Sequence, residues 1–271
     1  MITKGNFILM ETSEFRPWLT NQKITRSITK LQVHHTWLPN YSTRLNQDHF
    51  KCLEGIRNSH LANGWSGTGQ NITVFEDGKI AISLDRDLNK VPAGISGANT
   101  GALCIEIIGN FDIGGDTITS AQKQAVTHVY ACLSDKLNIT INTDNIVYHA
   151  WYTPSGSFLG DYDKNKSSKT CPGTNFWGDG NTKAAANKGF IKALKDEYER
   201  LKNGGDEVTK AEFEALEKRV AAIEEANKLI TAPKWFVDEF GSADLKGKIK
   251  DPKLTFEGWR TLAIDLRVPK N

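Results

Sequence analysis

Three side chains able to bind zinc are spread widely along the sequence. His34 and His149 each lie where a short strand is expected to end, and Cys171 lies in the turn segment Lys169-Thr170-Cys171-Pro172. One thiolate and two imidazoles make a competent zinc set that leaves a fourth position open for water. The long separations match no local metal motif, so these residues alone leave open the alternative of ordinary buried, hydrogen-bonded histidines.

A fourth polar residue, Glu106, interrupts the apolar run Leu103-Cys104-Ile105-Glu106-Ile107-Ile108. Burying an unpaired carboxylate costs several kcal/mol, so Glu106 must be paired, protonated or directed into a cleft. An ion pair with a basic residue and a general base beside a metal both satisfy this requirement.

The elements that must position these residues alternate between strands and helices. Asp77-Gly78 is a strong hairpin signal between two apolar runs. Thr119-Ser120-Ala121-Gln122 fits a capping box before a helical stripe. This order predicts an α/β fold, one mixed sheet covered by helices. The expected strands are 31–35, 72–75, 79–82, 103–108 and 146–149, and the expected helices are 50–61, 120–137 and 190–201.

The segment after Asn203-Gly204-Gly205 has a different periodicity. A heptad pattern predicts a helix that ends at Ala232-Pro233 and either forms a coiled coil with another copy, through residues 209–230, or lies on its own domain. The remaining residues, with aromatic clusters around Trp235 and Trp259, are expected to form a small helical appendage. The heptad positions are Phe213, Leu216, Val220, Ile223, Asn227 and Ile230.

Composition excludes several classes of protein. The formal net charge of +2 argues against nucleic-acid binding. No apolar run approaches the roughly 20 residues of a membrane span, so no membrane insertion is expected. The first residues lack the features of a secretory signal, which predicts synthesis in the cytoplasm. Four cysteines are too few and too scattered for a disulfide framework.

Over residues 28–178 the sequence resembles the zinc-dependent N-acetylmuramoyl-L-alanine amidases of bacteriophage endolysins, which share a fold with the peptidoglycan recognition proteins. The motifs that carry the resemblance occur in the family's order. They are Val33-His34-His35-Thr36, Ile56-Arg57-Asn58-Ser59-His60, Gly64-Trp65, Gly69-Gln70-Asn71, Asp77-Gly78, Asn99-Thr100-Gly101, Ile108-Gly109-Asn110-Phe111, His149 and Lys169-Thr170-Cys171-Pro172.

The resemblance implies a role for each matching position. His34, His149 and Cys171 match the zinc ligands. Lys169 matches a lysine held over the metal, and Glu106 matches a catalytic glutamate of some phage amidases. Many members have a tyrosine where this chain has Gln70, and the segment between His149 and Cys171 is longer than in many relatives. Trp37, Trp65, Gln70 and Asn71 are expected to flank the cleft, where they either contact substrate or serve ordinary packing.

Other residues near these motifs are expected to be structural. His35 should face away from the metal, and His60 should pack on its helix. Cys52, Cys104 and Cys132 are expected to be buried thiols.

The expected function follows from this resemblance. Residues 1–203 would form a Zn²⁺ amidase domain that cleaves the bond between N-acetylmuramic acid and the L-alanine of the stem peptide in peptidoglycan. Residues 204–271 would bind the cell wall, oligomerise, or do both. An endolysin would be made in the host cytoplasm and released to the wall. A non-catalytic peptidoglycan-binding module is the main alternative, and cleavage of another wall bond is the second.

Overall fold

The computed structural model describes residues 1–204 and 210–268, without the side chains of 210–217. Contacts divide the chain into two units, Met1–Gly204 and Gly205–Asn271, each described here by itself. Among the described helices, none has the length and apolar character needed to cross a membrane.

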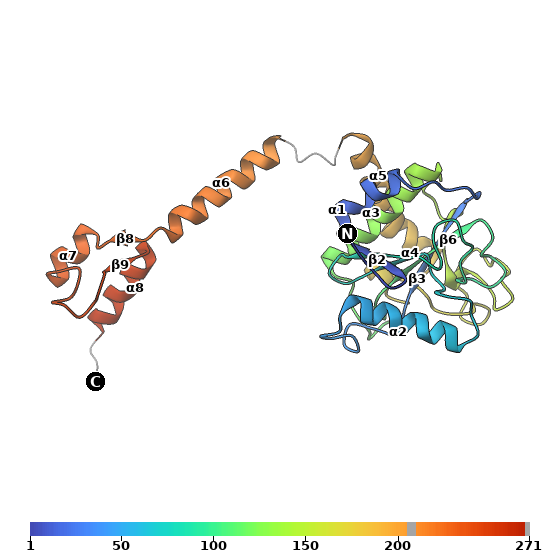
Figure 1. Ribbon diagram of the computed structural model, residues 1–271, viewed down its shortest axis with the longest axis horizontal. Helices are drawn as coiled ribbons and strands as arrows, with labels where there is room; N and C mark the ends of the chain where they lie inside the picture. Colours follow the sequence, from blue (N-terminus) through green and yellow to red (C-terminus); the bar gives the residue numbers. More distant parts are fainter. Residues whose placement is uncertain (205–209, 269–271) are drawn as a thin grey trace. The chain divides into compact units, whose positions relative to one another are not determined.

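A seven-stranded mixed sheet forms the centre of the first unit (Figure 1). Its order is β1-β2-β5-β4-β6-β3-β7; β4, β6, β3 and β7 run parallel, whereas β1, β2, β5 and β4 pair in antiparallel fashion. This sheet confirms the predicted α/β fold. The strands are β1 (Ile2–Lys4), β2 (Phe7–Met10), β3 (Lys30–His35), β4 (Ile72–Val74), β5 (Ile80–Ser83), β6 (Ala102–Ile107) and β7 (Ile146–Tyr148).

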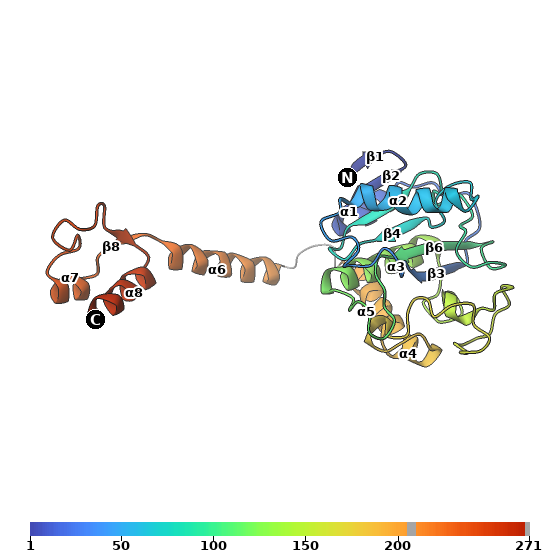
Figure 2. The ribbon, with the colours of Figure 1, turned by 90° about the horizontal axis from the view of Figure 1, so that it is seen from below.

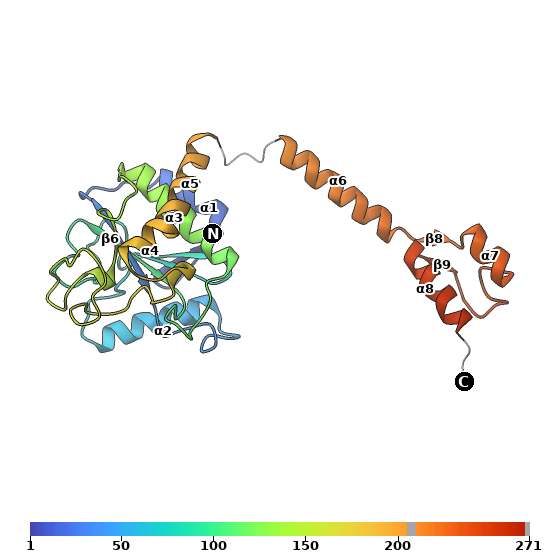
Figure 3. The same ribbon diagram turned by 180° about the vertical axis from the view of Figure 1, so that it is seen from behind.

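Helices cover both faces of the sheet (Figures 2 and 3). α2 packs on one face, and α1, α3 and α5 pack together on the other. Successive side chains of β5 point to opposite faces of the sheet. Ile80 and Ile82 therefore pack in the larger core, and Ala81 packs in the core beneath α2. The helices are α1 (Thr12–Thr20), α2 (His49–Ala62), α3 (Ser120–Leu137), α4 (Lys183–Lys188) and α5 (Phe190–Lys202).

The start of α3 shows half of the predicted capping box. The Thr119 hydroxyl accepts a hydrogen bond from the Gln122 backbone N–H at 3.0 Å. The Gln122 side chain instead donates to the Val74 and Ile108 carbonyls, at 3.1 and 2.9 Å. The reciprocal half of the box is therefore replaced by a link between helix and sheet, because the buried strand-end carbonyls need donors.

The sequence patterns missed the first elements of the chain. β1 and β2 form a hairpin that joins the sheet through β5. α1 follows and carries Pro17 inside the helix. A proline removes an N–H donor and normally ends a helical pattern. The buried Phe15 and Leu19 hold this helix against the core despite the proline.

The second unit has a small core of Phe236, Trp259 and Ala263, each at most 1% exposed. Trp259 Nε1 also donates to the Ile230 carbonyl at 3.1 Å. Two very short strands pair beside the helices, which the sequence patterns did not predict. The elements are α6 (Lys210–Asn227), β8 (Ile230–Thr231), α7 (Lys234–Phe240), β9 (Lys253–Leu254) and α8 (Phe256–Arg267).

The predicted heptad helix is shorter than expected. α6 ends at Asn227, whose side chain donates to the Ile223 carbonyl at 2.9 Å. Ile230 lies in β8 and packs on the small core, so its assignment to the heptad was wrong. Val220 and Ile223 are 45% and 59% exposed. The structure does not describe residue 209 or the side chains of Phe213 and Leu216.

Candidate metal centre

The ends of two neighbouring parallel strands, β3 and β7, and the turn that carries Cys171 bring the predicted ligands together. His34 lies at the end of β3, and β7 leads directly into the short turn His149–Trp151. The carboxyl ends of parallel strands meet at one edge of a sheet, although these residues are far apart in sequence. Ligand atoms of His34, His149 and Cys171 all lie within 4.8 Å of one another, and all three residues are buried.

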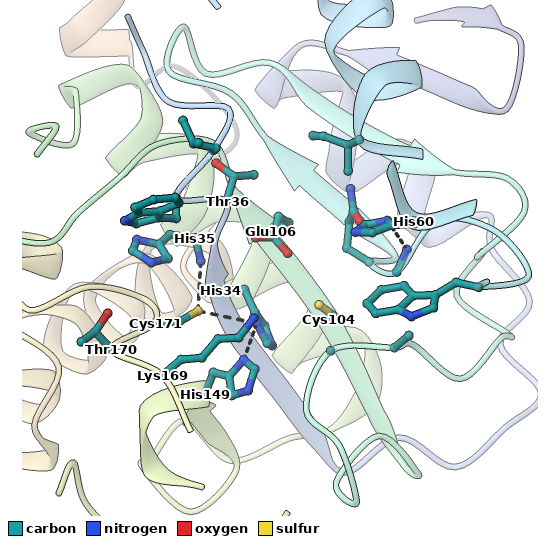
Figure 4. Close-up of a pocket in the computed structure, with 18 of the residues that line it drawn as sticks. His34, His35, Thr36, His60, Cys104, Glu106, His149, Lys169, Thr170 and Cys171 are labelled. Carbon is teal, nitrogen blue, oxygen red and sulfur yellow. Dashed lines mark hydrogen bonds between the residues drawn. The ribbon is translucent and has the colours of Figure 1, made fainter. Parts of the chain in front are cut away.

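The spacing of these atoms suits zinc. His34 Nδ1 lies 3.3 Å from His149 Nδ1 and 3.6 Å from Cys171 Sγ (Figure 4). Tetrahedral zinc, with its usual bond lengths, places two nitrogens roughly 3.3 Å apart, and nitrogen and sulfur roughly 3.6 Å apart. The donor set and its geometry therefore fit a zinc ion.

Backbone hydrogen bonds hold Cys171 in place. The His35 N–H donates to Cys171 Sγ at 3.3 Å, and the Ala150 N–H donates to the Cys171 carbonyl at 2.7 Å. Burial raises the pKa of the Cys171 thiol well above its usual range, and the nearby Glu106 raises it further. A cation at this position would favour the thiolate, which is the form that binds metals.

Glu106 is the general-base candidate beside these ligands. It is paired in register with His34 across β3 and β6. Burial raises the pKa of its carboxyl to about 7, although the positive charge of Lys169 lowers that pKa. A base with a pKa near the working pH transfers protons efficiently.

The three ligand candidates and Glu106 line one cavity of about 480 Å³. The exposed Lys169 lies over the ligands in Figure 4 and has no hydrogen-bond or ion-pair partner in the described part of the chain. Trp37 and Trp65, 54% and 39% exposed, also line the cavity. The lining includes His34, His35, Thr36, Trp37, Leu38, Ile56, His60, Trp65, Gln70, Gly94, Cys104, Glu106, Asp112, His149, Lys169, Thr170 and Cys171.

Two of the residues expected to contact substrate, Gln70 and Asn71, differ in their position relative to the cavity. Gln70 lines the cavity, although it is only 1% exposed, and its Nε2 donates to Thr73 Oγ1 at 3.0 Å. Asn71 is not among the lining residues, which runs against its expected role. Its Nδ2 donates to the carbonyls of Arg86, Asp87 and Lys90, and its Oδ1 accepts from the Cys104 N–H. Asn71 therefore braces the backbone.

A family model described as N-acetylmuramoyl-L-alanine amidase matches residues 24–174, more than half of the chain. The chain belongs to this family. The matched residues include all the proposed ligands, Glu106 and Lys169.

Solved structures with similar folds include two amidases of Clostridium intestinale. The chain is 24% identical to the amidase LysC, with a TM-score of 0.41, covering 57% of this chain and 83% of that one. It is 23% identical to the endolysin amidase LysCS, with a TM-score of 0.41, covering 65% and 86%. Drosophila PGRP-LB is 18% identical, with a TM-score of 0.43, covering 56% and 78%. No curated protein matches the chain.

Several residues of this amidase chain near the cavity were not assigned to it from the sequence. His60 lines the cavity; its Nδ1 accepts from the Gly69 N–H at 3.0 Å, and its ring stacks on Trp65 at 4.6 Å. The ring of His35 accepts from the Phe111 N–H at 3.1 Å, and its backbone reaches Cys171. These contacts join distant segments, and neither spacing nor residue type along the chain indicates them.

The three remaining cysteines are buried, as predicted, and none forms a disulfide. Cys52 lies in the core beneath α2 and Cys132 in the larger core. Cys104 differs from both because it lines the cavity, although it is only 1% exposed.

Proposed function

We propose that this chain is a zinc-dependent hydrolase of the amide bond between the lactyl group of N-acetylmuramic acid and the L-alanine of the stem peptide. The convergence of two imidazole nitrogens and one thiol at 3.3 and 3.6 Å carries the proposal. Membership of the amidase family supports this bond as the target. His34, His149 and Cys171 would hold the ion.

Zinc bound there would supply a Lewis acid that polarises the scissile carbonyl and acidifies a water molecule. Glu106 accepts the proton of the attacking water and returns it to the departing alanine amine. Its half-buried position beside His34 keeps the carboxylate close to both groups. The Lys169 ammonium stabilises negative charge developing on the carbonyl oxygen.

The substrate would enter between exposed aromatic side chains. Trp37 and Trp65 offer apolar faces to glycan or peptide at the cavity. Gln70 contributes a polar group to the cavity wall. We also propose that the chain acts as a phage endolysin on the host wall, and that residues 204–271 bind the wall or join copies of the chain.

Digestion of purified cell walls tests the reaction. New alanine amino groups should appear without new reducing sugar ends, and zinc removal should stop their release. New reducing ends would refute the amidase assignment. Wall binding without any cleavage by the zinc-loaded protein would favour the recognition-module alternative.

A further inference from the structure

Gln32 lies two residues before His34 in β3, on the same face of the sheet, and is fully buried. Its Nε2 donates to the Ala98 carbonyl at 2.9 Å, and its Oε1 lies 3.3 Å from His34 Nε2. A carbonyl oxygen only accepts, so the contact with Ala98 sets the orientation of the Gln32 amide.

This orientation determines which nitrogen of His34 carries the proton. Gln32 Oε1 can only accept, so His34 Nε2 must donate to it. A neutral imidazole carries one N–H, which leaves the lone pair on Nδ1. Nδ1 is the atom that faces His149 and Cys171.

The opposite side of the His34 ring meets a second group of potential metal ligands. Ligand atoms of His34, Cys104 and Glu106 also lie within 4.8 Å of one another. A β-carbon at position 94 would lie 3.0 Å from both Cys104 Sγ and His34 Nε2, which places Nε2 on the Cys104 side. Nitrogen, sulfur and oxygen donors together also suit zinc.

We propose that Gln32 is a positioning residue that keeps the His34 lone pair on Nδ1 and thereby directs the metal to His149 and Cys171 rather than to Cys104 and Glu106. Metal at the second group would occupy the carboxylate needed as base. Gly94 permits the arrangement, because a β-carbon there would lie 2.2 Å from Gln32 Oε1. The inference rests on the proposed zinc site.

The protonation of His34 can be read directly by ¹⁵N NMR of the metal-free wild-type protein. We expect the signals of an imidazole with hydrogen on Nε2. Hydrogen on Nδ1 would overturn the proposal, and this measurement needs no variant to fold.

Zinc affinity in two Gln32 variants separates hydrogen bonding from packing. Gln32→Met removes the acceptor, and we expect zinc affinity, measured by chelator competition, to fall about 10–100-fold. Gln32→Glu keeps an acceptor for Nε2–H and should recover most of the loss. Equal affinity in Gln32→Met and wild type, or equal losses in both variants, would overturn the proposal. Failure of the wild type to bind zinc would instead refute the proposed function.

Cobalt(II) spectra test the second group. Cys171→Ser alone should show no cobalt–thiolate absorption band, because Gln32 keeps the metal from Cys104. The double variant Gln32→Met, Cys171→Ser should show such a band, and adding Cys104→Ser should remove it. A band in Cys171→Ser alone, or none in the double variant, would overturn the selection by Gln32.

Discussion

His34 and Glu106 are paired in register across the parallel strands β3 and β6. The pairing places a metal-ligand candidate and a base candidate side by side on two interior strands of the sheet. Strands position catalytic groups more accurately than loops do. The relative placement of the two groups therefore depends on backbone pairing.

Loss of a ligand should remove the metal. In Cys171→Ser or His149→Ala we expect zinc content to fall below stoichiometric and wall hydrolysis to cease, while the fold is retained. Metal analysis and an alanine-release assay measure both effects. Cys52→Ser is the matched control, because Cys52 is a buried thiol in the separate core beneath α2. Full zinc and activity in Cys171→Ser would reject the assignment.

Glu106→Gln should separate chemistry from metal binding. The amide has nearly the same shape but cannot accept the water's proton, so zinc should remain bound while kcat falls about 100–10,000-fold. Steady-state kinetics on soluble wall fragments, together with metal analysis, test this expectation. Near-wild-type turnover would remove Glu106 from its role as base.

Lys169 should affect both rate and pH dependence. Lys169→Met removes a donor to the developing negative charge, which should lower kcat about 100–1,000-fold. Lys169 also lowers the pKa of Glu106. Because the ionised base is the active form, loss of the lysine raises that pKa and should move the acidic limb of the kcat/KM profile to higher pH.

Lys169→Arg should keep the acidic limb near its wild-type position, because it preserves the charge. Lys166→Met, in a lysine that is 68% exposed and paired with Asp163, is the matched control. An acidic limb that does not move in Lys169→Met would contradict the electrostatic link.

Glu197 should make stability depend on pH in acid. Burial would raise the pKa of its carboxyl, but hydrogen bonds from Arg200 and His128 outweigh burial and lower that pKa to about 2. A depressed pKa stabilises the fold above the unfolded-state value near 4.3, and this stability is lost as pH falls towards 2. Glu197→Gln should therefore lower the unfolding free energy by about 2 kcal/mol at pH 7 and much less near pH 2.

Denaturant unfolding of both proteins at several pH values measures this difference. Asp196→Asn is the control, since Asp196 is 64% exposed and its one ion pair within the described residues is with Lys192 on the same helix. If the loss of unfolding free energy in Glu197→Gln does not change with pH, packing of the side chain rather than its charge causes the loss.

The second unit should affect binding more than chemistry. A chain ending at residue 204 should hydrolyse soluble fragments at the wild-type rate but bind intact walls less tightly, or lose self-association. Wall sedimentation and light scattering measure these properties. A monomeric full-length protein whose wall binding survives the truncation would discard both roles.

The sequence predicted the main sheet because its apolar runs have strand length and its turns have recognisable residues. It could not predict α1, since Pro17 breaks the local pattern and only tertiary packing of Phe15 and Leu19 compensates. The same limit applies to the site. Residue types indicated His34 and Cys171, but the partner of His34 is a glutamine with no distinctive spacing. Ile230 was misassigned because heptad periodicity does not report where a helix ends.

The segment between His149 and Cys171 begins and ends at the metal centre, and the Ala150 N–H to Cys171 carbonyl bond joins the same two ends. A metal ion bound at both ends would close this segment into a loop. The closed loop has less conformational entropy than the same segment without metal. Loss of zinc would therefore affect the stability of this segment as well as catalysis. It would loosen the stretch that carries Lys169 and open it to proteolysis, so that a demetallated molecule would also be shorter-lived.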